Sequence, residues 1–318
     1  MITDQDRQKV IDGRHGLEDL EKSLVKALGP LSSNIDEFYK TITLPSSHKA
    51  ELKVWRSKST PAADRPLILM FHGGGFAAGS IEMCTRPGRE FAEDFGAVVV
   101  SSSYRLAPEN PFPASVSDGM DVARWLSTHA AEELGASLEK GFIVGGLSAG
   151  GNIAAVIAHQ LKHEALQFPI TGSFIGIAPL LIESTVPAQY KHLWTSRTDN
   201  PKGNPHFGYK GDERMVELLQ ADPASPLYSP TNDLAGLGGL PRTYFQLGDN
   251  DPLRDDCVVY AKALEDAGVQ VKMDIIPDIG HECFSIWYNE EEGSPKELKT
   301  KTMEGIAWLL GRTYSETG

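Results

Sequence analysis

The stretch FIVGGLSAGGNIAAVI, residues 142–157, decides how the rest of this 318-residue sequence is interpreted. It holds the pattern G-x-S-x-G at residues 146–150, directly after an apolar run and directly before apolar residues at helical spacing. A serine on a sharp strand-to-helix turn projects its hydroxyl from the sheet, and flanking glycines permit the close packing that such a turn needs. Ser148 is therefore a candidate nucleophile. The alternative is a glycine-rich loop whose serine only caps a helix.

Short apolar runs alternate with longer helical patterns along the chain. An antiparallel strand pair is expected at residues 38–44 and 50–55. Six further runs have the length of buried strands: residues 67–71, 98–102, 141–145, 173–177, 243–247 and 271–276. Helical patterns occur at residues 82–95, 115–134, 149–163, 253–267 and 296–310. Such alternation predicts an α/β fold in which helices flank a mostly parallel, eight-stranded sheet.

Two segments depart from this alternation and indicate a helical cap. Residues 1–35 carry apolar positions at helical spacing, which Gly29-Pro30 ends, and predict one or two amphipathic helices. About 60 residues separate the predicted strand 173–177 from the next strand, far more than an ordinary connection. We therefore expect one domain over residues 1–318, with a cap formed by about 1–35 and about 183–222. Ligands of open α/β sheets bind at the edge that this cap would cover.

A second glycine-rich segment, HGGGF at residues 72–76, follows a predicted strand. Consecutive glycines let backbone N–H groups approach a developing oxyanion closely. We expect the N–H groups of Gly74, Gly75 and Ala149 to form an oxyanion hole. A flexible turn or a phosphate cradle are alternatives, although the G-x-x-x-x-G-K-S/T arrangement of phosphate-binding loops is absent. His72 heads the glycines and is interpreted as a residue that positions the loop.

The partners of Ser148 are expected later in the chain, acid first and histidine last, if the chain is an α/β hydrolase. Asp251 and His281 each follow a predicted parallel strand, so both would lie at the same sheet edge as Ser148. His281 would accept the serine proton, and Asp251 would orient the imidazole and stabilise its charged form. Asp251 could instead cap the helix that follows it. Three nearby carboxylates are rivals for its role: Asp249, Asp255 and Asp256.

Composition argues against several classes of protein. The formal net charge of −13 is unsuited to a broad basic surface that binds nucleic acid or anionic membranes. Only three cysteines occur, Cys84, Cys257 and Cys283, so we expect reduced thiols rather than a disulfide framework. A charged N-terminal segment and the lack of a long apolar stretch predict neither a secretory signal nor membrane insertion. These features together predict a cytoplasmic protein.

The sequence resembles the hormone-sensitive lipase group of α/β hydrolases, which includes bacterial and fungal carboxylesterases, over roughly residues 60–310. The resemblance rests on HGGGF at 72–76, YRLAPE at 104–109, FPA at 112–114, SAGGN at 148–152, SPL at 225–227, DPLRD at 251–255 and His281. It implies that the glycine run supplies the oxyanion hole, that Asp251 orients the histidine and that a helical cap shapes the acyl and alcohol pockets. Three positions depart from the group's commonest pattern: Ser103, Leu147 and Glu282.

These features predict a serine hydrolase that cleaves carboxylic esters. An ester would acylate Ser148, the oxyanion hole would stabilise the tetrahedral intermediate, and water activated by His281 would release the acid. This chemistry needs no metal or organic cofactor. The same residues could transfer the acyl group to an alcohol or open a lactone or amide. A non-catalytic receptor is a further alternative, because the plant gibberellin receptor resembles this group but lacks the histidine.

The expected partner is a small-molecule ester, with no nucleic acid, and the resemblance allows a homodimer. A small or medium acyl chain, or a bulky natural-product ester, is expected. Large apolar side chains near the predicted loops or in the cap are candidates for the substrate pocket, and each could instead belong to the core. They are Phe76, Trp194, Phe207, Tyr209, Ile279 and Phe284.

Overall fold

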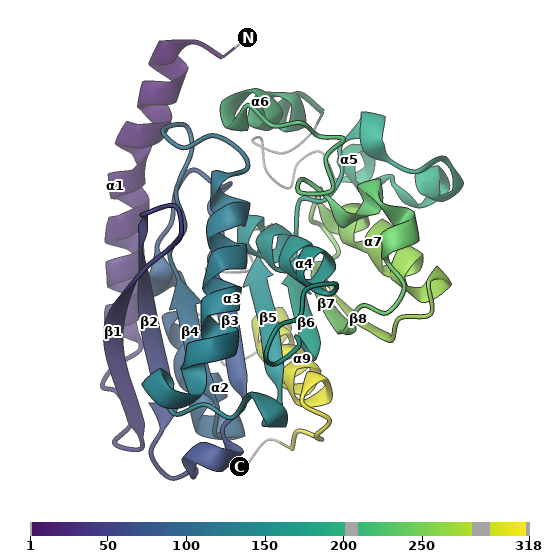
Figure 1. Cartoon of the computed structure of the whole chain (residues 1–318). Coiled ribbons are helices and arrows are strands. Elements are labelled where there is room, and N and C mark those ends of the chain that lie inside the picture. The colour runs from purple at the N-terminus through teal and green to yellow at the C-terminus, as the bar shows by residue number, and fades with distance from the viewer. Residues whose placement is uncertain (1, 201–208, 282–292, 316–318) are drawn as a thin grey trace.

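An eight-stranded sheet forms the centre of the computed structural model, which describes residues 2–200, 209–281 and 293–315 (Figure 1). Its strands lie in the order β1-β2-β4-β3-β5-β6-β7-β8. β2 is antiparallel to both β1 and β4, and the other neighbours are parallel. The strand bounds are β1 Ile35–Thr43, β2 Lys49–Ser57, β3 Leu67–Phe71, β4 Val98–Ser102, β5 Phe142–Leu147, β6 Gly172–Gly176, β7 Arg242–Gly248 and β8 Val271–Ile276. The predicted α/β fold with a mostly parallel sheet is confirmed.

Helices cover both faces of the sheet because successive strand residues point to opposite sides. In β3, Leu67, Leu69 and Phe71 pack into a core cluster that includes residues of α3 (Ala114–Leu134) and α4 (Ala149–Leu161). Ile68 and Met70 face the other way, into a cluster formed with α2 (Thr85–Phe95) and α9 (Gly293–Leu309). α7 (Arg254–Asp266) packs over β7 and contributes to a third cluster. Strands buried on both faces explain the continuous apolar runs in the sequence.

The N-terminal segment forms one helix, α1 (Asp4–Ala27), rather than two. A capping box between Thr3 and Asp6 starts it. The helix contacts the 3-10 turn Ile81–Cys84, and its N-terminal end lies near α6 (Figure 1). Polar contacts anchor it: Arg14 forms a bidentate pair with Glu109 at 2.6 and 2.7 Å, and buried Glu21 accepts hydrogen bonds from Ser80. α1 therefore docks through charged side chains more than through an apolar stripe.

The long connection after β6 carries short helices above the carboxyl ends of the strands (Figure 1). α5 (Ser196–Asp199) and α6 (Tyr209–Leu219) belong to it. α6 touches α1, since Arg7 Nη1 donates a hydrogen bond to the Leu218 carbonyl at 3.4 Å. Within the described ranges, none of the helices combines the length and the apolar character that a membrane crossing requires.

Candidate active site

Ser148 occupies a strained turn between β5 and α4. Its backbone angles, φ 53° and ψ −123°, are unusual for a residue with a side chain. Hydrogen bonds hold the turn on both sides, from the Ser148 N–H to the Gly176 carbonyl at 2.8 Å and from the Asn152 N–H to the Ser148 carbonyl at 3.0 Å. A Cβ on Gly150 would lie 2.1 Å from the Phe71 carbonyl oxygen, so only glycine lets these segments meet.

The side chains of Ser148, His281 and Asp251 form a continuous hydrogen-bonded chain. Ser148 Oγ lies 3.0 Å from His281 Nε2, and His281 Nδ1 lies 2.9 Å from Asp251 Oδ2. Asp251 is fully buried, and its Oδ1 accepts a 2.8 Å hydrogen bond from the Leu253 N–H. An ionised carboxylate only accepts, so Nδ1 carries the proton and Nε2 presents its lone pair to the serine hydroxyl. This arrangement suits proton abstraction from Ser148.

Two of the three rival carboxylates near Asp251 serve other contacts. Asp255 accepts hydrogen bonds from the backbone N–H groups of Thr195 and Ser196, at 2.8 and 2.7 Å. Asp256 accepts from the N–H groups of Leu180 and Leu181, at 2.9 and 3.0 Å. Both carboxylates therefore hold the connection after β6 against the start of α7.

The glycine run after β3 lies against Ser148. A Cβ on Gly73 would be 3.4 Å from the Ser148 Cβ. Gly74 and Gly75 have φ of 111° and 60°, and a Cβ on Gly74 would lie 2.2 Å from the Ala78 carbonyl oxygen. Within the described residues, the N–H groups of Gly74, Gly75 and Ala149 donate no hydrogen bond. Three backbone donors beside the hydroxyl are thus open to a ligand oxygen.

His72 is buried beneath this loop and stays neutral. Burial lowers the pKa of His72 to about 4. Its Nδ1 lies 2.7 Å from the Gly73 carbonyl oxygen, and its ring stacks on Tyr104 with centroids 4.3 Å apart. The Tyr104 hydroxyl donates to the His72 carbonyl at 2.9 Å. These contacts hold the glycine loop, and the low pKa makes His72 a poor general base at neutral pH.

A cavity of about 20 Å³ opens beside Ser148. Of the expected pocket residues, Phe76 lines it. The other lining residues are Gly75, Pro179, Leu181, Gly211, Asp212, Met215, Tyr228 and Leu253. Sequence patterns missed most of these because they come from α6 and from irregular segments that carry no motif.

The other candidate pocket residues lie elsewhere or outside the described chain. Trp194 is buried in the cluster that includes α7, and its Nε1 donates to Asp256 at 2.8 Å. Ile279 is buried in the cluster with α9, and its carbonyl accepts from Asn250. Both side chains pack in the core, and neither is among the described residues that line the cavity beside Ser148. The side chains of Phe207, Tyr209 and Phe284, and residue Glu282, lie outside the described residues.

A buried ion cluster links the cavity wall to the loop that carries Asp251. Arg197 of α5 pairs through Nε with Asp212 of α6 at 2.9 Å and through Nη2 with Asp256 of α7 at 3.1 Å. The same guanidinium donates to the carbonyl of Pro252. Burial raises the pKa of Asp212 to about 6, with Arg197 opposing the rise and the negative charge of Asp256 adding to it. No local sequence pattern predicts this cluster.

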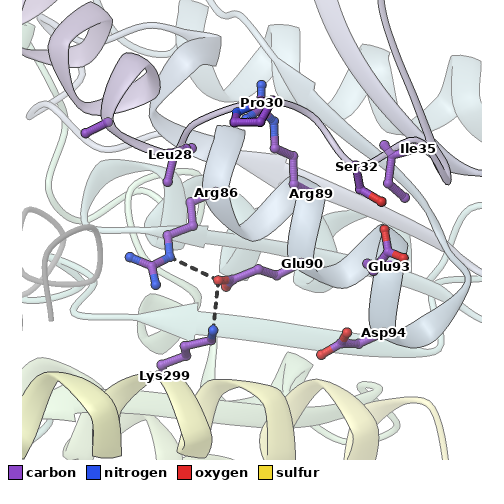
Figure 2. A pocket seen from close by; sticks show the side chains of 11 residues that line it. Leu28, Pro30, Ser32, Ile35, Arg86, Arg89, Glu90, Glu93, Asp94 and Lys299 are labelled. Atoms are coloured by element: carbon purple, nitrogen blue, oxygen red, sulfur yellow. Dashed lines mark hydrogen bonds and ion pairs between the residues drawn. The ribbon is translucent and has the colours of Figure 1, made fainter. Parts of the chain in front are cut away.

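A larger cavity, of about 540 Å³, lies between α2, α9 and the segment after α1 (Figure 2). Glu90 at its centre pairs with Arg86 at 3.0 Å and Lys299 at 3.1 Å. Its three cationic and three acidic lining residues balance, so it lacks the excess charge that an ionic ligand would need. Across the described ranges, no group of three or more His, Cys, Asp or Glu side chains is placed to hold a metal ion.

Comparison with known proteins assigns the family. A family model for the α/β-hydrolase fold matches residues 68–285. Versiconal hemiacetal acetate esterase of Dothistroma septosporum is 28% identical, over 94% of this chain and 88% of its own. Carboxylesterase NlhH of Mycobacterium tuberculosis is 33% identical, over 68% of this chain and 66% of its own. The crystal structure of vibralactone cyclase superposes with a TM-score of 0.86 at 25% identity, covering 95% of this chain and 89% of that one. With this fold and these relatives, the chain belongs to the α/β-hydrolase family, in the group that includes carboxylesterases.

Proposed function

We propose that the chain is a carboxylic ester hydrolase that uses Ser148 as nucleophile, His281 as general base and acid, and Asp251 to orient the imidazole. The observation that carries this proposal is the hydrogen-bonded chain from Ser148 Oγ through His281 to Asp251, with separations of 3.0 and 2.9 Å. The names of the two related esterases support the choice of an ester as substrate.

The reaction proceeds through an acyl-enzyme. His281 Nε2 takes the Ser148 proton as Oγ attacks the ester carbonyl, and the N–H groups of Gly74, Gly75 and Ala149 stabilise the oxyanion. The tetrahedral intermediate collapses as His281 returns the proton to the leaving alcohol. Water, deprotonated by His281, then attacks the acyl-enzyme and releases the acid. In this proposal α1 and α6 belong to a cap that covers the acyl-enzyme.

A second candidate function is transfer of the acyl group to a hydroxyl rather than to water. The structural match with vibralactone cyclase, at a TM-score of 0.86, supports acyl transfer as this second candidate. The same acyl-enzyme serves both reactions, and only the nucleophile in the second step differs.

Covalent labelling tests the proposed nucleophile. A fluorophosphonate should modify Ser148, and peptide mass spectrometry identifies the labelled residue. The Ser148→Ala variant should not be labelled, and its kcat should be lower by at least about 1,000-fold. Ser46→Ala, at an exposed position in the β1–β2 turn, is the matched control and should keep both. Labelling of another serine, or full turnover by Ser148→Ala, would refute the proposal. Product analysis with added alcohols separates hydrolysis from transfer.

A further inference from the structure

The cavity beside Ser148 has an apolar wall with one polar corner. Phe76, Leu181, Met215 and Leu253 provide apolar surface, whereas Asp212 and Tyr228 provide a carboxylate and a phenol. Ionisable groups beside a nucleophile in an apolar pocket fix the orientation of a ligand. This corner has no part in the proton transfers proposed for the reaction.

The two polar side chains of this corner keep unused hydrogen-bonding capacity. Asp212 Oδ2 accepts from Arg197 Nε at 2.9 Å, but within the described residues Oδ1 accepts no hydrogen bond. Tyr228 is only 9% exposed, and its hydroxyl has no hydrogen-bond partner among the residues that the structure describes. Neither atom is among the fully buried unpaired atoms of the described residues, so both are open at the cavity surface, where a polar ligand group can bond them.

Charge in the cluster behind the cavity is unevenly compensated. Arg197 supplies one positive charge between two carboxylates, Asp212 and Asp256. Asp256 is satisfied by four hydrogen bonds, from Trp194, Leu180, Leu181 and Arg197. Asp212 receives only one from the described residues. The excess negative charge therefore lies at the cavity wall, where it favours a hydrogen-bond donor from the substrate.

The size of the cavity limits what this corner holds. Its volume of about 20 Å³ exceeds the roughly 10–15 Å³ that a cavity needs to hold one water. A polar group of about the size of a water, such as a hydroxyl, therefore fits in this corner. A hydroxyl can donate to Asp212 and accept from Tyr228 at once, whereas an ammonium group can only donate and would leave the phenol unused.

We propose that Asp212 and Tyr228 are specificity-determining residues that select an ester carrying a hydroxyl group close to the scissile carbonyl. The hydroxyl donates to Asp212 Oδ1 and accepts from the Tyr228 hydroxyl while the carbonyl sits at Ser148. This proposal rests on the proposed role of Ser148, because the corner acts only on a substrate held there. A site built to hydrogen-bond a substrate hydroxyl discriminates against the analogue that lacks it.

Matched ester pairs test this selectivity in the 318-residue chain. The acyl arm compares 4-nitrophenyl 3-hydroxybutanoate with 4-nitrophenyl butanoate, and the alcohol arm compares 2-hydroxyethyl acetate with ethyl acetate by pH-stat titration. In at least one arm, kcat/KM should favour the hydroxylated ester by about tenfold or more. Each ratio compares two esters on the same enzyme, so it is independent of the active fraction of the preparation.

Variants assign the preference to the two residues. Tyr228→Phe removes only the unpaired hydroxyl and should lower the ratio by about threefold or more, and Asp212→Asn should bring it within about twofold of unity. Tyr190→Phe is the matched control, because the Tyr190 hydroxyl donates to Asp266, away from the cavity. The kcat/KM ratio of this variant should equal that of the wild type. If Asp212→Asn does not fold, the wild-type ratio and Tyr228→Phe still decide the question.

The outcomes separate this inference from the proposed function. Fluorophosphonate labelling of Ser148 with equal turnover of both members of each pair would overturn the inference and leave the hydrolase proposal standing. A wild-type preference that survives unchanged in both variants would overturn it as well. No labelling and no turnover of any ester would overturn the hydrolase proposal, and the inference with it.

Discussion

The loops that follow β3 and β5 and the connection that carries α5 and α6 meet at the same cavity, but different forces hold them. Backbone contacts position the loops: Gly150 packs on the Phe71 carbonyl, and Ser148 is bonded to Gly176. Side-chain charges position the connection, through Arg197 and the carboxylates of Asp212 and Asp256. The proposed chemistry therefore depends on backbone packing in the core, whereas the proposed selectivity depends on ion pairs between side chains.

The largest expected effect lies in the core loops. Asp251→Asn should lower kcat by about 10,000-fold, because an amide favours the wrong imidazole tautomer and does not stabilise its charged form. Steady-state kinetics on 4-nitrophenyl esters measures this loss. Asp249→Asn in the same loop is the control and should retain activity. Similar activity of the two variants would remove Asp251 from the proposed triad.

Backbone packing in the core loops should tolerate no side chain at Gly150. A methyl group there would lie 2.1 Å from the Phe71 carbonyl oxygen, so Gly150→Ala should reduce the free energy of unfolding by about 4 kcal/mol or prevent folding. Gly13→Ala in α1 meets no atom within 4 Å and should be neutral or stabilise by up to about 1 kcal/mol. Urea denaturation compares the two. A Gly150→Ala variant of unchanged stability would contradict the described packing.

The ion cluster should respond unequally at its two carboxylates. Asp256→Asn leaves buried Arg197 with one carboxylate partner, Asp212, and weakens four hydrogen bonds, so we expect a loss of about 3 kcal/mol. Burial raises the pKa of Asp212 from its ordinary value of 3.8 to about 6. Ionisation of this carboxyl group therefore lowers the free energy of unfolding as the pH rises through that range. Asp212→Asn removes this cost and should change stability by less than about 1 kcal/mol at pH 8. Urea denaturation measures both variants. Equal losses in the free energy of unfolding would contradict this expectation and show that the two carboxylates stabilise the fold equally.

The smallest expected effect is a pH dependence of substrate selectivity. Asp212 faces Arg197 of α5, Asp256 of α7, Glu213 of its own helix and Tyr228. Above pH 6 its carboxylate is ionised and accepts strongly; below pH 6 protonation weakens the acceptor. The kcat/KM ratio of hydroxylated to plain ester should therefore fall several-fold between pH 7.5 and 5. Both esters use the same proposed triad, so its titration cancels in the ratio. A flat ratio from pH 7.5 to 5 would mean that the charge of Asp212 has no role.

The sequence alone determined the sheet and the position of its loops. Three strands, β3, β4 and β8, begin and end at the predicted residues, and the others differ only at their ends. Apolar runs of strand length are local signals, and so is the glycine spacing around Ser148. Since parallel strands all end at one edge, chain order was enough to predict that loops carrying Ser148, Asp251 and His281 would lie together.

Only the tertiary structure decided what surrounds that edge. Arg197 meets Asp212 and Asp256 across 15 and 59 residues of chain, and no periodic pattern encodes those pairings. Trp194 looked like a pocket residue, but its indole is buried against α7. Tyr228 directly follows the SPL stretch at 225–227, but nothing in that stretch predicted that its side chain would reach the cavity. Local spacing specifies elements, whereas ion pairs and cavity walls depend on where distant segments return, which packing alone determines.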